Sequence, residues 1–236
     1  MMLRQIKEDI DVALEKDPAA RNALEVLILY PGVHALIAYR FNHWLWGLGM
    51  KFIARSLSQI ARWVTGIEIH PAAIIGKRFF IDHGMGVVIG ETSEVGDNVF
   101  VYQGVTLGGL ATKKGKRHPT ISDDVVIGAG AKVLGPIKIG CNTKIGSGSV
   151  VLQDVPEYST VIGVPGRVVF SGISSEMEDE DGPESFPDPV ARAIECMLDR
   201  LPEMEKEIRQ LKETLKENGI TDLSSIDETA RKENSC

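Results

Sequence analysis

Branched apolar residues recur at every sixth position through the middle of the chain. Thirteen positions keep this period, in three blocks that run from Ile69 to Ile81, from Ile89 to Leu107 and from Ile121 to Val151. Glycine directly follows many of them, at Gly76, Gly90, Gly96, Gly108, Gly128, Gly140 and Gly146. A fixed short period indicates a solenoid, because each repeat buries its apolar side chain against its neighbours. Six residues make one short strand and a turn, so three hexads predict one triangular coil of stacked parallel strands.

The pattern differs on either side of this repeat. Residues 1–66 carry apolar residues at helix spacing, interrupted at Asp17-Pro18 and Pro31-Gly32, and predict an N-terminal helical domain. Residues 67–170 form the solenoid domain, and residues 171–189 are acidic and rich in Ser, Gly and Pro, which predicts a linker. Heptad spacing returns in residues 190–236 and predicts a C-terminal helical extension and tail. The fold class is therefore α+β.

The hexad period slips by two residues at two places. Ile81 and Ile89 are eight residues apart, and Leu107 and Ile121 are fourteen apart, where multiples of six would be expected. An interruption of a regular repeat is a common place for function to be attached. The first slip contains Asp82-His83 and the second contains Arg117-His118. We therefore place the candidate functional residues at the two slips.

The first slip has the residue types of a general base. A carboxylate beside a histidine fixes the imidazole tautomer and stabilises the imidazolium that forms when a hydroxyl is deprotonated. Asp82 adjoins His83, Glu68 lies about one coil earlier, and Glu91 follows closely. The same residues are also compatible with ordinary turns that carry solvated charges.

The second slip has the residue types of an anion site. Arg117 offers a planar fork for a carboxylate, and Lys113, Lys114 and Lys116 offer charges for a phosphorylated cofactor. An ordinary basic surface loop is the alternative interpretation.

Composition narrows the class of protein. The 24 glycines and the 6% aromatic content suit a solenoid with many turns and an aliphatic interior. The net charge of −7 gives no general attraction for nucleic acid or anionic lipid, so neither is an expected partner. Three cysteines without a CxxC pair indicate neither a disulfide framework nor a thiolate metal site, and favour a cytoplasmic location. The least polar run, residues 26–39, is interrupted by Pro31-Gly32, so no membrane span is expected.

Several motifs together resemble the serine O-acetyltransferases of the hexapeptide-repeat acyltransferase superfamily, over about residues 15–170. They are Glu68-Ile69-His70-Pro71-Ala72-Ala73, Ile81-Asp82-His83-Gly84, Gly104-Val105-Thr106-Leu107-Gly108-Gly109, Lys116-Arg117-His118-Pro119 and Gly163-Val164-Pro165-Gly166-Arg167. The general rule for parallel crossovers favours a right-handed coil. The resemblance implies the left-handed parallel β-helix of this superfamily instead, and left-handedness is expected on that ground alone.

The resemblance also implies an activity. Members transfer the acetyl group of acetyl-CoA to the hydroxyl of L-serine by direct attack, giving O-acetyl-L-serine and CoA in the first step of cysteine biosynthesis. Carried over by position, His83 is the general base with Glu68 as its carboxylate partner, and His118 pairs with Asp82. The implied serine-binding residues are Asp17, Asp82, Arg117, His118 and Glu91, and the implied acetyl-CoA-binding residues are Gly109, Ala129, Lys144 and Ser147. No metal is expected.

The resemblance further implies an assembly and an inhibitor. A homotrimer is expected, with each active site between neighbouring solenoids, and L-cysteine is the expected feedback inhibitor. The N-terminal helical region is shorter than in the members that join two trimers, so a hexamer is left open. Docking onto O-acetylserine sulfhydrylase uses a C-terminal Ile in many members, and this chain ends Asn234-Ser235-Cys236, so that complex is not expected.

Three other functions fit parts of the sequence. An acetyltransferase for a sugar or antibiotic hydroxyl would use the same scaffold, but it has no need for Arg117 and Asp17 as a clamp for an amino acid. A zinc enzyme of the carbonic anhydrase type would need three converging imidazoles, for which His70, His83 and His118 lack the HxxxxH spacing. An inactive scaffold would not need the intact histidines and carboxylates at both slips.

Overall fold

The computed structural model describes residues 2–171, which belong to a compact unit spanning Met1–Phe186. A second unit, Pro187–Cys236, lies outside the described residues. The predicted C-terminal helical extension and, apart from Ser171, the predicted acidic linker therefore also lie outside them.

Four helices precede the repeat, so the predicted helical character of the N-terminal region is confirmed. They are α1 (Met2–Lys16), α2 (Ala23–Leu29), α3 (Pro31–Gly47) and α4 (Lys51–Thr65). The Asn22 side chain caps α2 by accepting a hydrogen bond from the Glu25 amide at 2.9 Å, and proline occupies the first turn of α3. Helix α4 ends at Gly66, whose φ of 73° is the left-handed conformation that suits a helix C-terminus. These three boundaries are thus set by local sequence signals.

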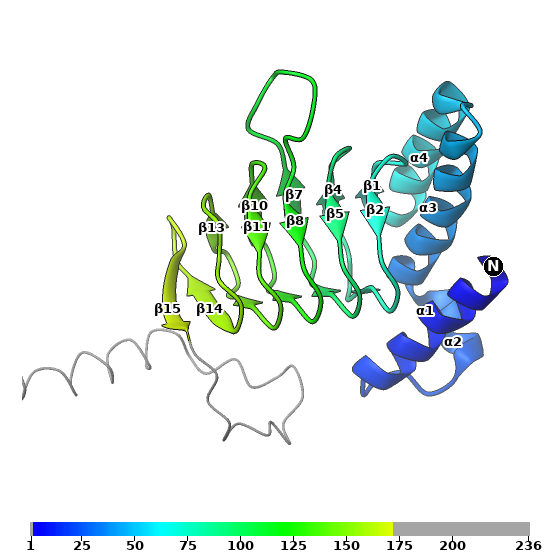
Figure 1. Ribbon diagram of the computed structural model, residues 1–236. Helices are drawn as coiled ribbons and strands as arrows, with labels where there is room; N and C mark the ends of the chain where they lie inside the picture. The colour runs from blue at the N-terminus through cyan, green and yellow to red at the C-terminus, as the bar shows by residue number, and fades with distance from the viewer. Residues whose placement is uncertain (1, 172–236) are drawn as a thin grey trace, which may run out of the picture. The chain divides into compact units, whose positions relative to one another are not determined.

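The repeat folds into short strands that form three faces, called A, B and C below, and Figure 1 labels many of the strands. Face A consists of β1 (Glu68–Ile69), β4 (Val88–Ile89), β7 (Thr106–Gly108), β10 (Lys132–Leu134) and β13 (Val150–Val151). Face B consists of β2 (Ile74–Ile75), β5 (Glu94–Val95), β8 (Thr120–Ile121) and β11 (Lys138–Ile139). Face C consists of β3 (Phe80–Ile81), β6 (Phe100–Val101), β9 (Val126–Ile127), β12 (Lys144–Ile145), β14 (Ser159–Ile162) and β15 (Arg167–Ser171).

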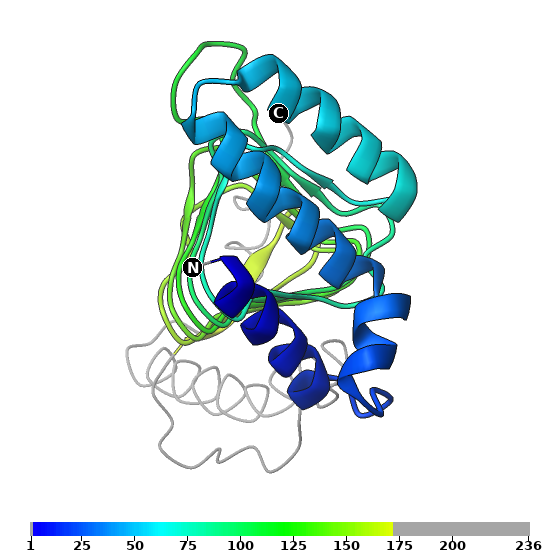
Figure 2. The same ribbon diagram turned by 90° about the vertical axis from the view of Figure 1, so that its right-hand side faces the viewer.

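The strands of successive coils pair in parallel, except for the antiparallel hairpin of β14 and β15. On face A the register places the hexad residues Ile69, Ile89 and Leu107 directly above one another. These residues are buried, as are the hexad residues of the other faces, and together they fill the interior. The predicted triangular coil is confirmed, and Figure 2 looks along it.

The chain passes from face A to B to C and back to A, so the turns gather on three edges. Edge AB follows the face A strands and includes residues 70–73, 90–93 and 109–119. Edge CA precedes them and includes residues 82–87, 102–105, 128–131 and 146–149. The slip at Asp82-His83 lies on edge CA, whereas the slip at Arg117-His118 lies in the long loop of edge AB that projects in Figure 1. The two slips are therefore on different edges of one chain.

The helices cover the first coil and share its core (Figure 2). Leu36 and Tyr39 of α3 pack with the solenoid interior, and the Tyr39 hydroxyl donates to the Ala73 carbonyl at 2.7 Å. Asp9 and Arg40 form a buried pair with two hydrogen bonds of 2.7 Å, which ties α1 to α3. The arrangement of the helices is thus fixed relative to the first coil.

Among the described residues, no single helix has the length and apolar character needed to cross a membrane. Helices α2 and α3 reach that threshold only as a pair, and the pair is bent by 75°.

Gly32 provides a test of this packing. A Cβ at Gly32 would collide with the carbonyl oxygen of Ile81 and lie 3.1 Å from the Ile81 Cβ, so α3 approaches β3 closely only without a side chain there. We expect Gly32→Ala to lower the free energy of unfolding by about 1–3 kcal/mol, measured by urea denaturation.

Gly47 is the matched control at the other end of α3. Apart from its chain neighbours and the backbone of α3, no atom of the described residues lies within 4 Å of the position that a Cβ would take at Gly47. Gly47→Ala should therefore raise the free energy of unfolding by about 0.5–1 kcal/mol. Equal effects of the two substitutions would contradict the close approach at Gly32.

Candidate active site

Asp82 and His83 form the turn that leaves β3 on edge CA. The Gly84 amide donates to the Asp82 carbonyl at 2.6 Å, and His83 takes a left-handed φ of 56° that is uncommon for a residue with a side chain. This turn directs the His83 imidazole outward, where its side chain is 75% exposed. Its Nε2 lies 3.9 Å from the Asp82 carboxylate. The pair is therefore open to a ligand.

The N-terminal helices add a second carboxylate beside this turn. Asp17 follows α1, and one of its carboxylate oxygens accepts a hydrogen bond from the Ala19 amide at 2.8 Å, while the other accepts one from the Tyr30 hydroxyl. Burial raises the pKa of the Asp82 carboxyl and the negative charge of Asp17 raises it further, although His83 acts in the opposite direction. Asp17 is thus near enough for its charge to act on Asp82, and two neighbouring carboxylates favour a bound cation.

His118 lies on edge AB, where it is 7% exposed. Its Nδ1 accepts from the Thr92 amide at 3.2 Å and lies 2.8 Å from the Thr92 hydroxyl. A neutral imidazole with an acceptor at Nδ1 carries its proton on Nε2. Burial lowers the pKa of His118, Arg117 lowers it further and Glu91 partly offsets this, so the neutral form is favoured. His118 therefore presents an Nε2 hydrogen-bond donor at neutral pH.

Thr92 also organises the long loop before β8. Its hydroxyl accepts from the Arg117 amide at 3.0 Å and from the His118 amide at 3.1 Å. The Lys116 amine donates to the Thr92 carbonyl at 2.8 Å and pairs with Glu94 at 2.9 Å. The end of the loop is thus held by one threonine.

Arg117 pairs with Glu91 at 2.8 Å, so the two residues lie together as candidate ligands on edge AB. Gly109 is next to them, since a Cβ there would lie 3.1 Å from the Arg117 Cγ. Of the other predicted cofactor residues, Ala129 and Ser147 are on edge CA, where the Gly148 amide donates to the Ala129 carbonyl at 2.8 Å. Lys144 is an exposed residue of β12 on face C.

Glu68 has arginine partners. Its carboxylate pairs with Arg55 at 2.9 Å and with Arg62 at 3.1 Å, both from α4. Burial of Glu68 raises the pKa of its carboxyl, but the two arginines more than offset this and hold the pKa below its ordinary value. Glu68 is therefore an ionised carboxylate fixed by α4.

Two predicted pairs are not formed within one chain. No hydrogen bond or ion pair joins Glu68 to His83 in residues 2–171, because Glu68 is held by the arginines of α4. His118 does not meet Asp82, because the two residues are on different edges of the coil. The candidate residues of a single chain thus form two separate groups, one on edge CA and one on edge AB, which we call candidate half sites.

Sequence reasoning missed four residues at these half sites. Tyr30 contacts Asp17, Thr92 holds His118, and Arg55 and Arg62 hold Glu68. A sequence signal existed only for Thr92, which directly follows Glu91 on the same turn. Tyr30 lies between α2 and α3, and Arg55 and Arg62 lie on α4. Their contacts depend on how the helices pack, which no motif in the sequence reveals.

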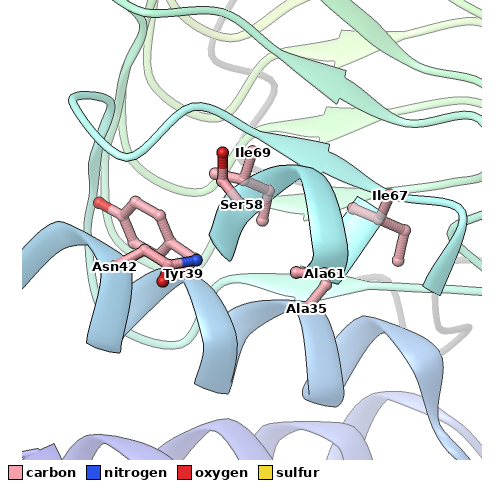
Figure 3. A pocket seen from close by; sticks show the side chains of 7 residues that line it. All are labelled: Ala35, Tyr39, Asn42, Ser58, Ala61, Ile67 and Ile69. Atoms are coloured by element: carbon pink, nitrogen blue, oxygen red, sulfur yellow. The ribbon is translucent and has the colours of Figure 1, made fainter. Parts of the chain in front are cut away.

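A small pocket is lined by none of the candidate site residues. Figure 3 shows it between α3, α4 and the first coil, lined by Ala35, Tyr39, Asn42, Ser58, Ala61, Ile67 and Ile69. Its volume of about 10 Å³ is room for about one water molecule, so it is not a substrate site. Within residues 2–171, no cluster of three or more His, Cys, Asp or Glu side chains is arranged to hold a metal ion.

The triangular coil of six-residue repeats defines the chain as a hexapeptide-repeat protein. Residues 118–153 match the family of bacterial transferase hexapeptides (six repeats). A serine acetyltransferase of Bacillus licheniformis is 57% identical over 92% of this chain and 96% of its own length. The chain belongs to the serine acetyltransferase family.

Solved structures agree with this family. A serine acetyltransferase of Neisseria gonorrhoeae in complex with serine is 43% identical over 72% of this chain and 69% of that one, with a TM-score of 0.69. Another serine acetyltransferase, in complex with cysteine, is 43% identical over 72% of this chain and 70% of that one, with a TM-score of 0.70. The α+β fold with a left-handed parallel β-helix is thereby confirmed for the described residues.

Thr92 allows the organisation of edge AB to be tested. Thr92→Val removes the acceptor of the Arg117 and His118 amides, and two amides without an acceptor destabilise the loop. We expect the amides of residues 110–118 to exchange at least about ten-fold faster, measured by hydrogen exchange with mass spectrometry.

Thr92→Ser is the control, because it keeps the hydroxyl and should leave exchange near the wild-type rate. Exchange near the wild-type rate in Thr92→Val would contradict the role of the hydroxyl.

Proposed function

We propose that this protein transfers the acetyl group of acetyl-CoA to the hydroxyl of L-serine, giving O-acetyl-L-serine for cysteine biosynthesis. The observation that carries the proposal is the exposed Asp82-His83 pair beside Asp17, in a chain 57% identical to a serine acetyltransferase. Acetylation of a free amino acid at its hydroxyl requires a base for the hydroxyl, a site for the ammonium group and a site for the carboxylate.

The two half sites supply complementary charges for serine. Asp17 and Asp82 attract the ammonium group, which relieves the repulsion that raises the pKa of Asp82. Arg117 binds the serine carboxylate in place of its present partner Glu91, or together with it, because a guanidinium has donors on more than one side. Bound serine is thus oriented at both ends, with its hydroxyl toward His83.

The reaction is a direct transfer. His83 takes the proton of the serine hydroxyl as that oxygen attacks the thioester carbonyl, and the C–S bond of the tetrahedral intermediate then breaks. The Gly109 amide stabilises the oxyanion, and the departing CoA thiolate receives the proton from His83. Acetyl-CoA lies along edge CA at Ala129 and Ser147 and reaches Lys144 and Gly109. The role of Glu68 as partner of His83 stays a prediction.

We further propose a homotrimer, because one chain holds only half of each site. In a closed ring, edge CA of one subunit meets edge AB of the next, which brings Asp82 and His118 together. The His118 Nε2–H then donates to Asp82. Helix α4 supports association, since it exposes Phe52 (84%) and Trp63 (91%) in the single chain.

L-cysteine is the proposed feedback inhibitor. It has the ammonium and carboxylate of serine, so Asp17, Asp82 and Arg117 offer it the same contacts, and a related enzyme has been solved in complex with cysteine. We place the reaction in the cytoplasm because the three cysteines show no disulfide spacing.

The activity is tested by CoA release from acetyl-CoA with L-serine. His83→Ala should lower kcat by about 10²–10⁴, the usual contribution of a general base. His34→Ala is the control, because the His34 imidazole bonds to the Leu27 carbonyl of α2 and not to a candidate site residue, so turnover should stay at the wild-type level. CoA release with a sugar hydroxyl but not with serine would refute the acceptor, and near-normal turnover in His83→Ala would refute the base.

The shared site is tested by mixing two inactive subunits. His83→Ala damages edge CA and His118→Ala damages edge AB, so each homotrimer should be inactive. Co-expression in equal amounts should restore about a quarter of wild-type activity, because random assembly pairs the two intact edges at one interface in four. Mixed subunits without activity would indicate that each site lies within one chain.

A further inference from the structure

Tyr30 has an unusually fixed backbone. It is both the C-terminal cap residue of α2 and the residue before α3, with its amide donating to Val26 at 3.2 Å and its carbonyl accepting from His34 at 3.1 Å. Its φ of −94° and ψ of 105° are the extended conformation that a following proline, here Pro31, imposes. Tyr30 therefore cannot move without shifting two helices.

The Tyr30 side chain is directed to the half site of edge CA. Its ring is partly buried against the cluster that includes Val26, Val33 and Phe80, and its hydroxyl donates to the Asp17 carboxylate. It makes no capping hydrogen bond to α3. The pKa of the phenol is raised to about 12, chiefly by burial and then by Asp17, so the hydroxyl remains a donor at any physiological pH.

Two hydrogen-bond donors hold the Asp17 carboxylate in place. The Ala19 amide holds one of its oxygens at 2.8 Å and the Tyr30 hydroxyl holds the other. Asp82 repels Asp17, since the Asp17 charge is one cause of the raised pKa of Asp82. Without the phenol, the Asp17 carboxylate could turn away from Asp82 and lower this repulsion whenever no cation is bound.

We infer that Tyr30 is a positioning residue for the acceptor, whose hydroxyl holds Asp17 beside Asp82 so that both carboxylates receive the ammonium group. The inference rests on the proposed function. Tyr30 does not contact the reacting atoms, and its effect reaches serine only through Asp17.

The test compares steady-state kinetics of Tyr30→Phe with those of the wild type. The KM for L-serine should rise about ten-fold, the loss of one hydrogen bond to a charged group. The KM for acetyl-CoA should not change, and kcat should stay within about three-fold, because the base and the thioester site are intact.

Tyr39→Phe is the matched control. It likewise removes one phenolic donor, here from α3, but the partner of Tyr39 is the Ala73 carbonyl in the core. It should lower thermal stability while leaving the KM for serine unchanged. An equal rise in both variants would mean that Tyr30 is only structural, and would overturn the inference.

A double-mutant cycle with Asp17→Asn tests whether Tyr30 affects serine binding through Asp17. If Tyr30 acts through Asp17, adding Tyr30→Phe to Asp17→Asn should change kcat/KM for serine by less than about two-fold. Additive losses would overturn the inference. A wild-type protein that does not acetylate serine would overturn the proposed function and the inference together, whereas active wild type with an unchanged KM in Tyr30→Phe would overturn the inference alone.

Discussion

The parallel hydrogen-bond ladder between coils is the constraint on which the rest of the structure depends. Each strand is only a few residues long, so it is stable only when its neighbours lie in register above and below it. This register requires an inward branched side chain at the same position in each strand of a face, such as Ile69, Ile89 and Leu107 on face A. An added residue has no place inside this stack, and it must leave the coil at an edge.

This constraint explains why both candidate half sites are on edges. The two extra residues after Ile81 widen the turn that carries His83, and the longer insertion after Leu107 forms the loop that ends at His118. The buried ladder beneath each turn fixes its base, while the projecting side chains are free to meet a ligand. A rigid scaffold with reactive groups on its turns is a common way to build an enzyme.

The helices add what the repeat cannot supply. The apolar interior of the first coil has no coil before it to cover it. Helix α3 covers it, and the close contact is possible because Gly32 has no side chain against Ile81. The same helices place Asp17 and Tyr30 near Asp82. The charge of Asp17 acts on Asp82, and the Tyr30 hydroxyl holds Asp17. On face A, α4 contributes the arginines that hold Glu68. Covering the core and shaping the site are thus parts of one arrangement.

The sequence by itself determined the elements, because their signals are local: the six-residue period, the helix boundaries at Pro31 and Gly66, and the slips that hold Asp82, His83, Arg117 and His118. It also carried enough motif to place the chain in its family. Only the tertiary structure decided which of these residues meet. The period gives the number of residues between two turns. The path of the chain around the three faces decides on which edge each turn lies, and it places His118 and Asp82 on different edges of one chain. Likewise, the contacts of Tyr30 with Asp17 and of Arg55 with Glu68 join residues thirteen positions apart across helix packing, which no short-range pattern encodes.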